Sequence, residues 1–115
     1  MIRSVLALRA KPGRSQAVED FYRDRGIIDR AVRFPGCRGV MLLRSTDGGP
    51  DTHIVVADWD DAAAYAGWVA DPWRVEVGAD LADLIDSDVD TEAVPAGRLY
   101  EFVSASSPAA SEEPS

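Results

Sequence analysis

The chain has 115 residues, 46% of them hydrophobic, a size and composition that fit one globular domain with its own core. Its 20 acidic and 12 basic side chains give a formal net charge of −8, which argues against partners that require clustered Lys and Arg, such as nucleic acid or an anionic membrane surface. The single cysteine, Cys37, excludes an internal disulfide and, with no signal-peptide pattern at the N-terminus, favours a cytoplasmic location.

The chain begins with a predicted strand and a predicted helix. Residues 2–9 place alternate side chains on two faces, which is typical of a strand. Residues 15–33 carry apolar side chains at helical spacing, with Ser15 as the expected N-cap. Gly26 lies within this helix and marks the position where we expect it to bend.

Two further strands form a predicted hairpin. Residues 37–45 and 52–59 are largely apolar runs with the length of strands. Between them, the TDGGPD segment at 46–51 supplies the glycines that a tight reversal needs. The second and third strands should therefore pair antiparallel.

The second half of the chain predicts two helices and a last strand. The helices are expected over 61–70 and 73–86, separated by an Asp-Pro pair that breaks the helical pattern. An acidic loop at 87–97 leads to a strand at 98–103. Residues 104–115 are rich in Ser, Ala, Pro and Glu and cannot bury enough apolar surface to fold, so we expect a disordered tail.

The resulting order, βαββαβ, is typical of an α+β, ferredoxin-like domain, here spanning residues 1–103. Such a domain has an antiparallel sheet with helices on one face. The other face would carry apolar side chains, Val40 or Met41 and Val55 or Val56, so it must also be covered. The simplest cover is a second copy of the chain, which predicts a homodimer with the two sheets face to face.

All three tryptophans lie in one stretch, DWDDAAAYAGWVADPWR at 58–74. Trp59 is the last residue of the third predicted strand, and its position fits either a core anchor or part of a pocket wall. Tyr65 and Trp68 share a helix face with small residues, and this pattern fits either core packing or a cleft for a flat ligand. Trp73 follows a proline at a helix start and is expected at a pocket mouth or at a dimer edge.

Several short motifs together resemble a known family. They are KPG before the first helix, FPGC before the second strand, AAAY in the next helix, and ADPW followed by Arg. In this order, over about residues 2–103, they are similar to the antibiotic biosynthesis monooxygenase domains, which implies a small dimeric α/β barrel. The resemblance does not imply one chemistry, because the family includes cofactor-free oxygenases of aromatic polyketides, haem-degrading enzymes, binders of aldehydes and quinols, and members with no known reaction.

The polyketide-oxygenase branch of this family implies a set of pocket residues that the chain matches in part. Trp59 and Tyr65 match its strand Trp and helix Tyr. Its Asn, its strand Tyr and its helix Arg are not matched. These positions hold Val55, about Leu42 and about Gly78, with Arg74 one turn before the last of them.

The haem-degrading branch implies a helix Trp followed by an axial His. Trp68 matches the Trp, but residues 76–79 contain no histidine, and the only one in the chain, His53, lies on a strand. One His and one Cys cannot build a zinc site, and no glycine-rich nucleotide loop is present. We therefore expect no metal and no cofactor.

The catalytic candidates are His53, Arg74 and Tyr65. His53 would share a face with Val55 and Trp59 and act as general base from the cleft, although a solvated position at the strand end is the competing interpretation. Arg74 or Tyr65 would stabilise the resulting oxyanion, whereas the competing interpretation of Arg74 is a solvated helix face. The expected substrate-binding residues are Trp59, Trp68, Trp73, Tyr22 and Val55.

These residues favour a cofactor-independent monooxygenase or oxidase that acts with O₂ on a polycyclic aromatic, polyketide-type phenol in antibiotic biosynthesis. Such a phenol reacts with O₂ once it is deprotonated, so the protein needs to bind it away from water, remove a proton and stabilise the anion. A polyketide cyclase on the same fold is one alternative. A non-catalytic, dimeric small-molecule-binding protein is another, and the missing Asn and Arg favour it.

Overall fold

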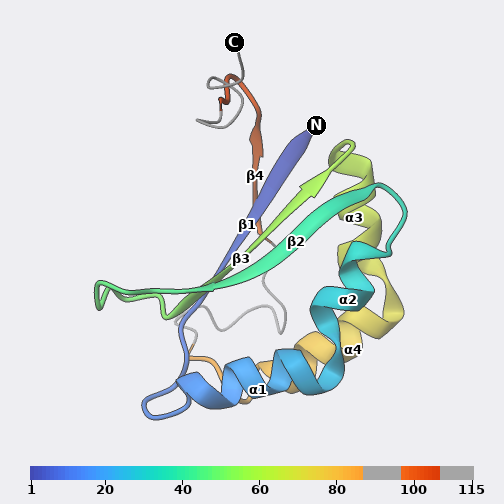
Figure 1. Cartoon of the computed structure of the whole chain (residues 1–115). Coiled ribbons are helices and arrows are strands. Elements are labelled where there is room, and N and C mark those ends of the chain that lie inside the picture. The colour runs from blue at the N-terminus through green and yellow to red at the C-terminus, as the bar shows by residue number, and fades with distance from the viewer. Residues whose placement is uncertain (87–96, 107–115) are drawn as a thin grey trace.

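A computed structural model describes residues 1–86 and 97–106 (Figure 1). The strands form one antiparallel sheet in the order β2-β3-β1-β4. They are β1 (Ile2–Leu8), β2 (Cys37–Arg44), β3 (His53–Trp59) and β4 (Arg98–Glu101). Because β1 lies between β3 and β4, the arrangement is the ferredoxin-like α+β fold, and this prediction is confirmed.

The described helices all cover one face of the sheet, which we call the inner face (Figure 1). They are α1 (Ser15–Arg25), α2 (Ile27–Val32), α3 (Ala62–Ala70) and α4 (Pro72–Leu81). Their apolar side chains pack on the inner face in two clusters, one containing Val18 and Leu81 and the other containing Trp59 and Trp68. Trp73 packs against both clusters, so the core is continuous behind the sheet.

The predicted helix over 15–33 is two helices, because the backbone turns sharply at Gly26. Gly26 has φ 62° and ψ 36°, the left-handed conformation that glycine adopts without steric cost, and its N–H donates to the Arg23 carbonyl. The expected bend is therefore a break. The expected cap is also displaced: Ser15 is the first helical residue, and Arg14 occupies the cap position without a side-chain cap bond.

Two aspartates fix the starts of the second pair of helices. Asp61 accepts a 2.9 Å hydrogen bond from the Ala64 N–H at the start of α3. Asp71 accepts bonds from the N–H groups of Trp73 and Arg74 at 3.1 and 3.3 Å, which satisfies donors that the first turn of α4 leaves unpaired. The cap thus fixes the turn of α4 that carries Trp73 and Arg74.

Helix α4 ends at Leu81, short of the predicted end at 86. Beyond it, Ile85 forms a bridge with Ala10, and the Asp86 N–H donates to the Arg9 carbonyl at 2.6 Å. The apolar stripe of the sequence continues to Ile85, but the chain there pairs with the residues that follow β1 rather than forming a further helical turn.

The sheet face that lies opposite the helices, the outer face, is apolar. It is defined by Val5, Ala7, Met41, Leu43, Ile54 and Val56, which the strand register places together. No described helix covers it, and Met41 and Leu43 remain 46% and 42% exposed. The register also resolves which residues of each predicted pair face outward: Met41 and Val56 do, whereas Val40 and Val55 face the helices.

One end of the outer face carries an ion pair. The Nε and Nη2 atoms of Arg3 donate to the Asp58 carboxylate at 2.7 and 3.1 Å, and the guanidinium lies 5.2 Å from the ring centre of Phe102. The pair forms within one chain, because Arg3 and Asp58 are directly opposite in the register of β1 and β3.

The last elements are shorter than expected. Strand β4 ends at Glu101 rather than at 103, and residues 102–106 are exposed and without regular secondary structure. Most of the predicted acidic loop (87–96) and of the predicted tail (107–115) lies outside the described residues. Within the described ranges, no helix combines the length and the apolar character needed to cross a membrane.

Candidate functional site

A cavity lies between the inner face of the sheet and the helices. It offers about 60 Å³ to the centre of a water-sized sphere, several times the ~10–15 Å³ that one water requires by that measure. Most of its wall is aliphatic or aromatic. The aromatic and polar side chains that line it are Ser4, Tyr22, Trp59, Tyr65, Trp68, Trp73 and Arg74. A cavity of this kind favours a flat, largely apolar ligand with a polar group at one point.

Every candidate site residue from the sequence lines this cavity except His53. Val55 and Trp59 come from β3, Tyr65 and Trp68 from α3, and Trp73 and Arg74 from α4, while Tyr22 reaches it from α1. Sequence reasoning missed Ser4, which has the buried inner-face position between Ile2 and Leu6. The alternation of β1 places Ser4 on the apolar face, and a lone hydroxyl there is the signal that could have identified it.

Trp59 is both a core anchor and part of the cavity wall. It is 0% exposed, and its indole N–H donates to the Ser4 hydroxyl at 3.0 Å. Its ring meets Phe34 and Tyr65 edge to face, with centroid separations of 6.4 and 5.5 Å. These contacts fix the orientation of the ring, so Trp59 gives the cavity one rigid wall.

Trp68 and Trp73 form a second wall. Their ring centroids are 6.3 Å apart, and Phe34 lies against Trp68 at 5.5 Å. Trp73 is half-buried, and the guanidinium of Arg30 lies over its ring at 4.2 Å. Trp73 therefore joins the cavity to the surface between α2 and α4, which supports the expectation of a position at the mouth.

Arg74 is the main polar feature of the cavity. The residue is only 8% exposed, and its Nη1 atom is buried without a hydrogen-bond partner among the described residues. Burial lowers the pKa of Arg74, and the nearby phenols of Tyr65 and Tyr22 oppose that shift. The alternative of a solvated helix face is thus wrong. Gly78, one turn later on the same helix, also lines the cavity.

Two buried phenols accompany Arg74. Burial raises the pKa of Tyr22 to about 12, although the positive charge of Arg74 acts in the opposite direction. Tyr22 is therefore a neutral hydrogen-bond donor at neutral pH. The Tyr65 oxygen accepts a 2.6 Å bond from the Gly97 N–H, which leaves the Tyr65 proton available for another acceptor.

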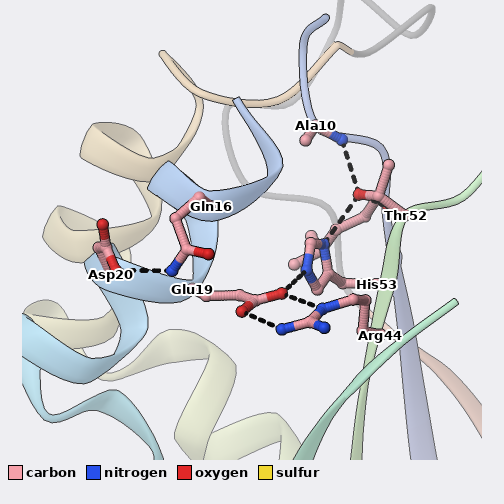
Figure 2. Close-up of polar contacts among 8 residues, drawn as sticks. Ala10, Gln16, Glu19, Asp20, Arg44, Thr52 and His53 are labelled. Atoms are coloured by element: carbon pink, nitrogen blue, oxygen red, sulfur yellow. Dashed lines mark hydrogen bonds and ion pairs between the residues drawn. The ribbon is translucent and has the colours of Figure 1, made fainter. Parts of the chain in front are cut away.

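The structure places His53 elsewhere, among α1 and the ends of β1 and β2 (Figure 2). His53 lies on the inner face but is 1% exposed, so it is not the solvated residue that one interpretation predicted. Its Nε2 is 2.8 Å from a Glu19 carboxylate oxygen, and its Nδ1 is 2.8 Å from the Thr52 hydroxyl. Both ring nitrogens are thus engaged, and the expectation that His53 faces the cleft as a base is not met.

The bonds around His53 hold three parts of the chain together. Glu19 of α1 also forms a two-point ion pair with Arg44 of β2, at 2.6 Å for each bond. The Thr52 hydroxyl accepts from the Ala10 N–H at 3.0 Å, beyond the end of β1 (Figure 2). Since Glu19 and His53 are far apart in sequence, their pairing had no signal in the spacing of residues. The geometry indicates a structural role.

Replacing Glu19 by alanine should therefore destabilise the fold. A buried imidazole that loses its partner costs about 1–3 kcal/mol, and we expect a loss of that size in the free energy of unfolding at pH 7, measured by urea denaturation. Asp20→Ala is the matched control, because Asp20 is a neighbouring acid of α1 whose contacts with Gln16 and Arg23 lie at the surface, and its loss should cost less than about 0.5 kcal/mol.

The stability lost in Glu19→Ala should also depend on pH. Hydrogen bonds from Arg44 and His53 hold the pKa of Glu19 at about 2, below its usual value. A carboxyl whose pKa is lower in the folded state stabilises the fold above its unfolded pKa and loses that contribution as the pH falls toward 2. The difference in stability between the parent and Glu19→Ala should shrink over this acid range. A constant difference would contradict the assignment.

Neither a metal site nor a reactive thiol appears in the described part of the chain. No group of three or more His, Cys, Asp or Glu side chains there could hold a metal ion. Burial raises the pKa of the Cys37 thiol, which disfavours the thiolate that a nucleophile requires. The chemistry available at the cavity is therefore that of Arg74, two phenols and an aromatic wall.

Solved structures of similar fold cover nearly the whole chain. SnoaB, a cofactor-independent oxygenase from Streptomyces nogalater, is 19% identical with a TM-score of 0.68, and the match covers 90% of this chain and 94% of SnoaB. A protein of unknown function from Nitrosomonas europaea is 23% identical with a TM-score of 0.67, and 93% of each chain is covered. At these identities the likeness shows the fold alone. Among curated proteins, none matches the sequence significantly.

The sequence itself matches a family model. The model is that of the antibiotic biosynthesis monooxygenases, and it matches residues 1–73, from the start of the chain to the first turn of α4. This range contains β1, the β2–β3 hairpin and α3, and so most of the elements that build the cavity. The resemblance that the short motifs indicated is confirmed, and the chain belongs to the antibiotic biosynthesis monooxygenase family.

Proposed function

We propose that the protein is a cofactor-independent monooxygenase or oxidase that acts on a phenolic, polyketide-type aromatic compound in antibiotic biosynthesis. The observation that carries this proposal is the buried guanidinium of Arg74, without a partner among the described residues, in a cavity walled by aromatic rings. The likeness to SnoaB, itself a cofactor-independent oxygenase, supports the reaction class. The aromatic walls suit a planar substrate, and the guanidinium suits the oxygen anion of its reactive form.

The reaction needs little from the protein beyond binding. An anthrone-like methylene and O₂ give a carbonyl and one water, so that atoms and electrons balance without an external reductant. The enolate of such a substrate is the electron-rich species that reacts with O₂. A dry cavity with a fixed cation favours this anion, because the electrostatic interaction is stronger where water is excluded.

Each lining residue has a role in this proposal. Arg74 holds the substrate oxygen anion, and the hydroxyls of Tyr22 and Tyr65 donate hydrogen bonds beside it. Trp59 and Trp68 supply the walls against which a planar ring system packs. His53, which the sequence suggested as the general base, has no part in this proposal. It does not line the cavity, and both of its ring nitrogens are engaged by Thr52 and Glu19.

The direct test is O₂ consumption by the purified protein with an anthrone as substrate. We expect uptake without added metal, flavin or haem, with one O₂ consumed per anthrone oxidised. Arg74→Met should reduce the rate at least about 10-fold, since a hydrogen bond to a charged group contributes about 1.5–3 kcal/mol. If the protein binds the anthrone but consumes no O₂, the proposed reaction is wrong.

That last outcome would favour a non-catalytic binding protein, the second candidate function. One observation supports it: the cavity lining among the described residues contains no carboxylate and no imidazole that could act as a base. The Asn position of the polyketide-oxygenase branch holds Val55 and its Arg position falls at about Gly78, and both residues line the same cavity. The cavity would then bind an aromatic anion without converting it.

We also propose that a second copy of the chain covers the outer face. Its exposed apolar side chains would otherwise lie in water. Light scattering should therefore give twice the mass of one chain, and Met41→Lys should shift it to one chain, because a buried lysine without a partner is unfavourable at such an interface. Val75→Lys is the control, since Val75 is equally exposed on α4 and should leave the mass unchanged. A monomeric parent protein would refute this assembly.

A further inference from the structure

The described polar side chains that line the cavity offer hydrogen-bond donors and no basic acceptor to a ligand. The Ser4 hydroxyl accepts from Trp59 and points its own proton to the Ala57 carbonyl, so it is already engaged. The Tyr65 oxygen already accepts from the Gly97 N–H, which leaves its proton free. Tyr22 is a neutral phenol, and Arg74 has no acceptor capacity at all. The lining residues that the structure describes thus offer hydrogen atoms and one positive charge to a ligand.

A lining of this kind cannot take a proton from a ligand. None of the described lining residues is Asp, Glu or His. The only histidine has both ring nitrogens bound outside the lining, one of them to the carboxylate of Glu19. A neutral acid that entered this cavity would therefore leave the Arg74 charge unpaired and would find no side chain among the described lining residues to accept its proton.

The unpaired charge of Arg74 also gives the cavity a strong preference. A cation removed from water without a counter-ion is unfavourable in the empty protein, and an anion that pairs with it removes this cost. A neutral ligand of the same shape would fill the same apolar space but would leave the guanidinium unpaired. The energetic difference between the two ligands therefore arises at Arg74 and not at the aromatic walls.

From these observations we infer that the cavity selects planar aromatic ligands that arrive already ionised, as carboxylates, enolates or acidic phenolates, and rejects their neutral isosteres. This inference rests on the proposed function, because it names the substrate class of the same site. It requires the substrate to lose its proton to water before entry. Its source is then a reaction that delivers an acidic product, such as the hydrolysis of an aryl thioester or the formation of an acidic enol.

The test compares two ligands of the same shape by isothermal titration calorimetry with the full chain at pH 7. 2-Naphthoate carries a negative charge, and 2-naphthamide replaces it with a neutral group of similar size. We expect naphthoate to bind at least about 10-fold more tightly, because its carboxylate pairs with the positive charge of Arg74 and the neutral amide does not. Equal affinity, or tighter binding of the amide, would overturn the inference.

Three variants locate the effect. Arg74→Met should abolish the preference for naphthoate while leaving the weaker affinity for naphthamide unchanged. Arg74→Lys should retain part of the preference, which guards against a loss caused by misfolding, and melting curves check that each variant is folded. Arg23→Met removes the same charge from an exposed site on α1 and should leave the preference intact. A preference that survives in a folded Arg74→Met protein would refute the assignment to Arg74.

The two experiments distinguish a failure of this inference from a failure of the proposed function. If naphthoate is preferred through Arg74 but no anthrone supports O₂ uptake, the inference stands and the oxygenase proposal fails. If anthrones support O₂ uptake but the amide binds as well as the acid, the oxygenase proposal stands and the inference fails.

Discussion

Arg74→Met is expected to leave the ligand-free protein at least as stable as the parent, although it removes the central residue of the cavity. Arg74 is 8% exposed, and its buried Nη1 has no partner among the described residues, so the folded state has an uncompensated cost of desolvation. Methionine fills a similar volume without that cost. Replacement of buried charges by apolar side chains is often neutral or stabilising by about 1–4 kcal/mol, and we expect a change in this range in urea unfolding.

With naphthoate present, the parent protein should instead have the larger free energy of unfolding of the two. Naphthoate should stabilise the parent protein in proportion to its affinity and should stabilise Arg74→Met much less. Arg74 would thus lower the stability of the ligand-free protein while strengthening ligand binding, which is characteristic of functional rather than structural side chains. If Arg74→Met lost more than about 2 kcal/mol without ligand, the guanidinium would have a structural partner and the cavity would not be an anion site.

Trp59→Ala is expected to be the most destabilising substitution in the aromatic cluster. Trp59 is completely buried, bonds Ser4 through its indole N–H and lies against Phe34 and Tyr65. Truncation of a tryptophan in such a position costs about 3–5 kcal/mol. Trp59→Phe keeps a ring in contact with both neighbours and should cost less. Denaturant unfolding of the two variants measures the difference.

Trp68→Ala provides the contrast. Trp68 packs against Phe34 and Trp73 and also lines the cavity. Because a side chain on a cavity wall has fewer packing partners, we expect the substitution to cost about 1–2 kcal/mol. Its effect should appear instead in binding, as a weaker affinity for naphthoate and naphthamide alike. A loss of stability equal to that of Trp59→Ala would show that Trp68 is a core residue and that the wall has no role in binding.

The fold was predictable because its signals are local. Alternation along the strands, helical spacing between them and the glycine-rich hairpin are each contained in a short window of sequence, and together they give the strand and helix order. The limits of the helices were less predictable. At Gly26 the sequence permits either a bend or a left-handed break, and packing decides between them. At the end of α4, pairing of Ile85 with Ala10 replaces a helical turn.

The candidate site was predictable in part for the same reason. Tyr65, Trp68, Trp73 and Arg74 lie close together in sequence, so one stretch indicated the cavity. The partners of His53 did not follow from the sequence, because Glu19 lies on α1, far from β3 along the chain. A histidine on the inner face fits a base and a structural residue equally well until its neighbours are known.

The hydrogen bond between Tyr65 and Gly97 connects the cavity to the edge of the sheet. A Cβ atom at position 97 would lie 2.9 Å from the Tyr65 oxygen and 3.1 Å from the Val5 backbone, so only glycine fits there. Gly97 immediately precedes β4, which pairs with the first half of β1. A ligand that accepts the Tyr65 proton would polarise the hydroxyl and strengthen its bond to the Gly97 amide. A ligand in the cavity would then hold the start of the edge strand β4 more firmly. The hydrogen-exchange rate of the Gly97 amide would fall when the ligand binds.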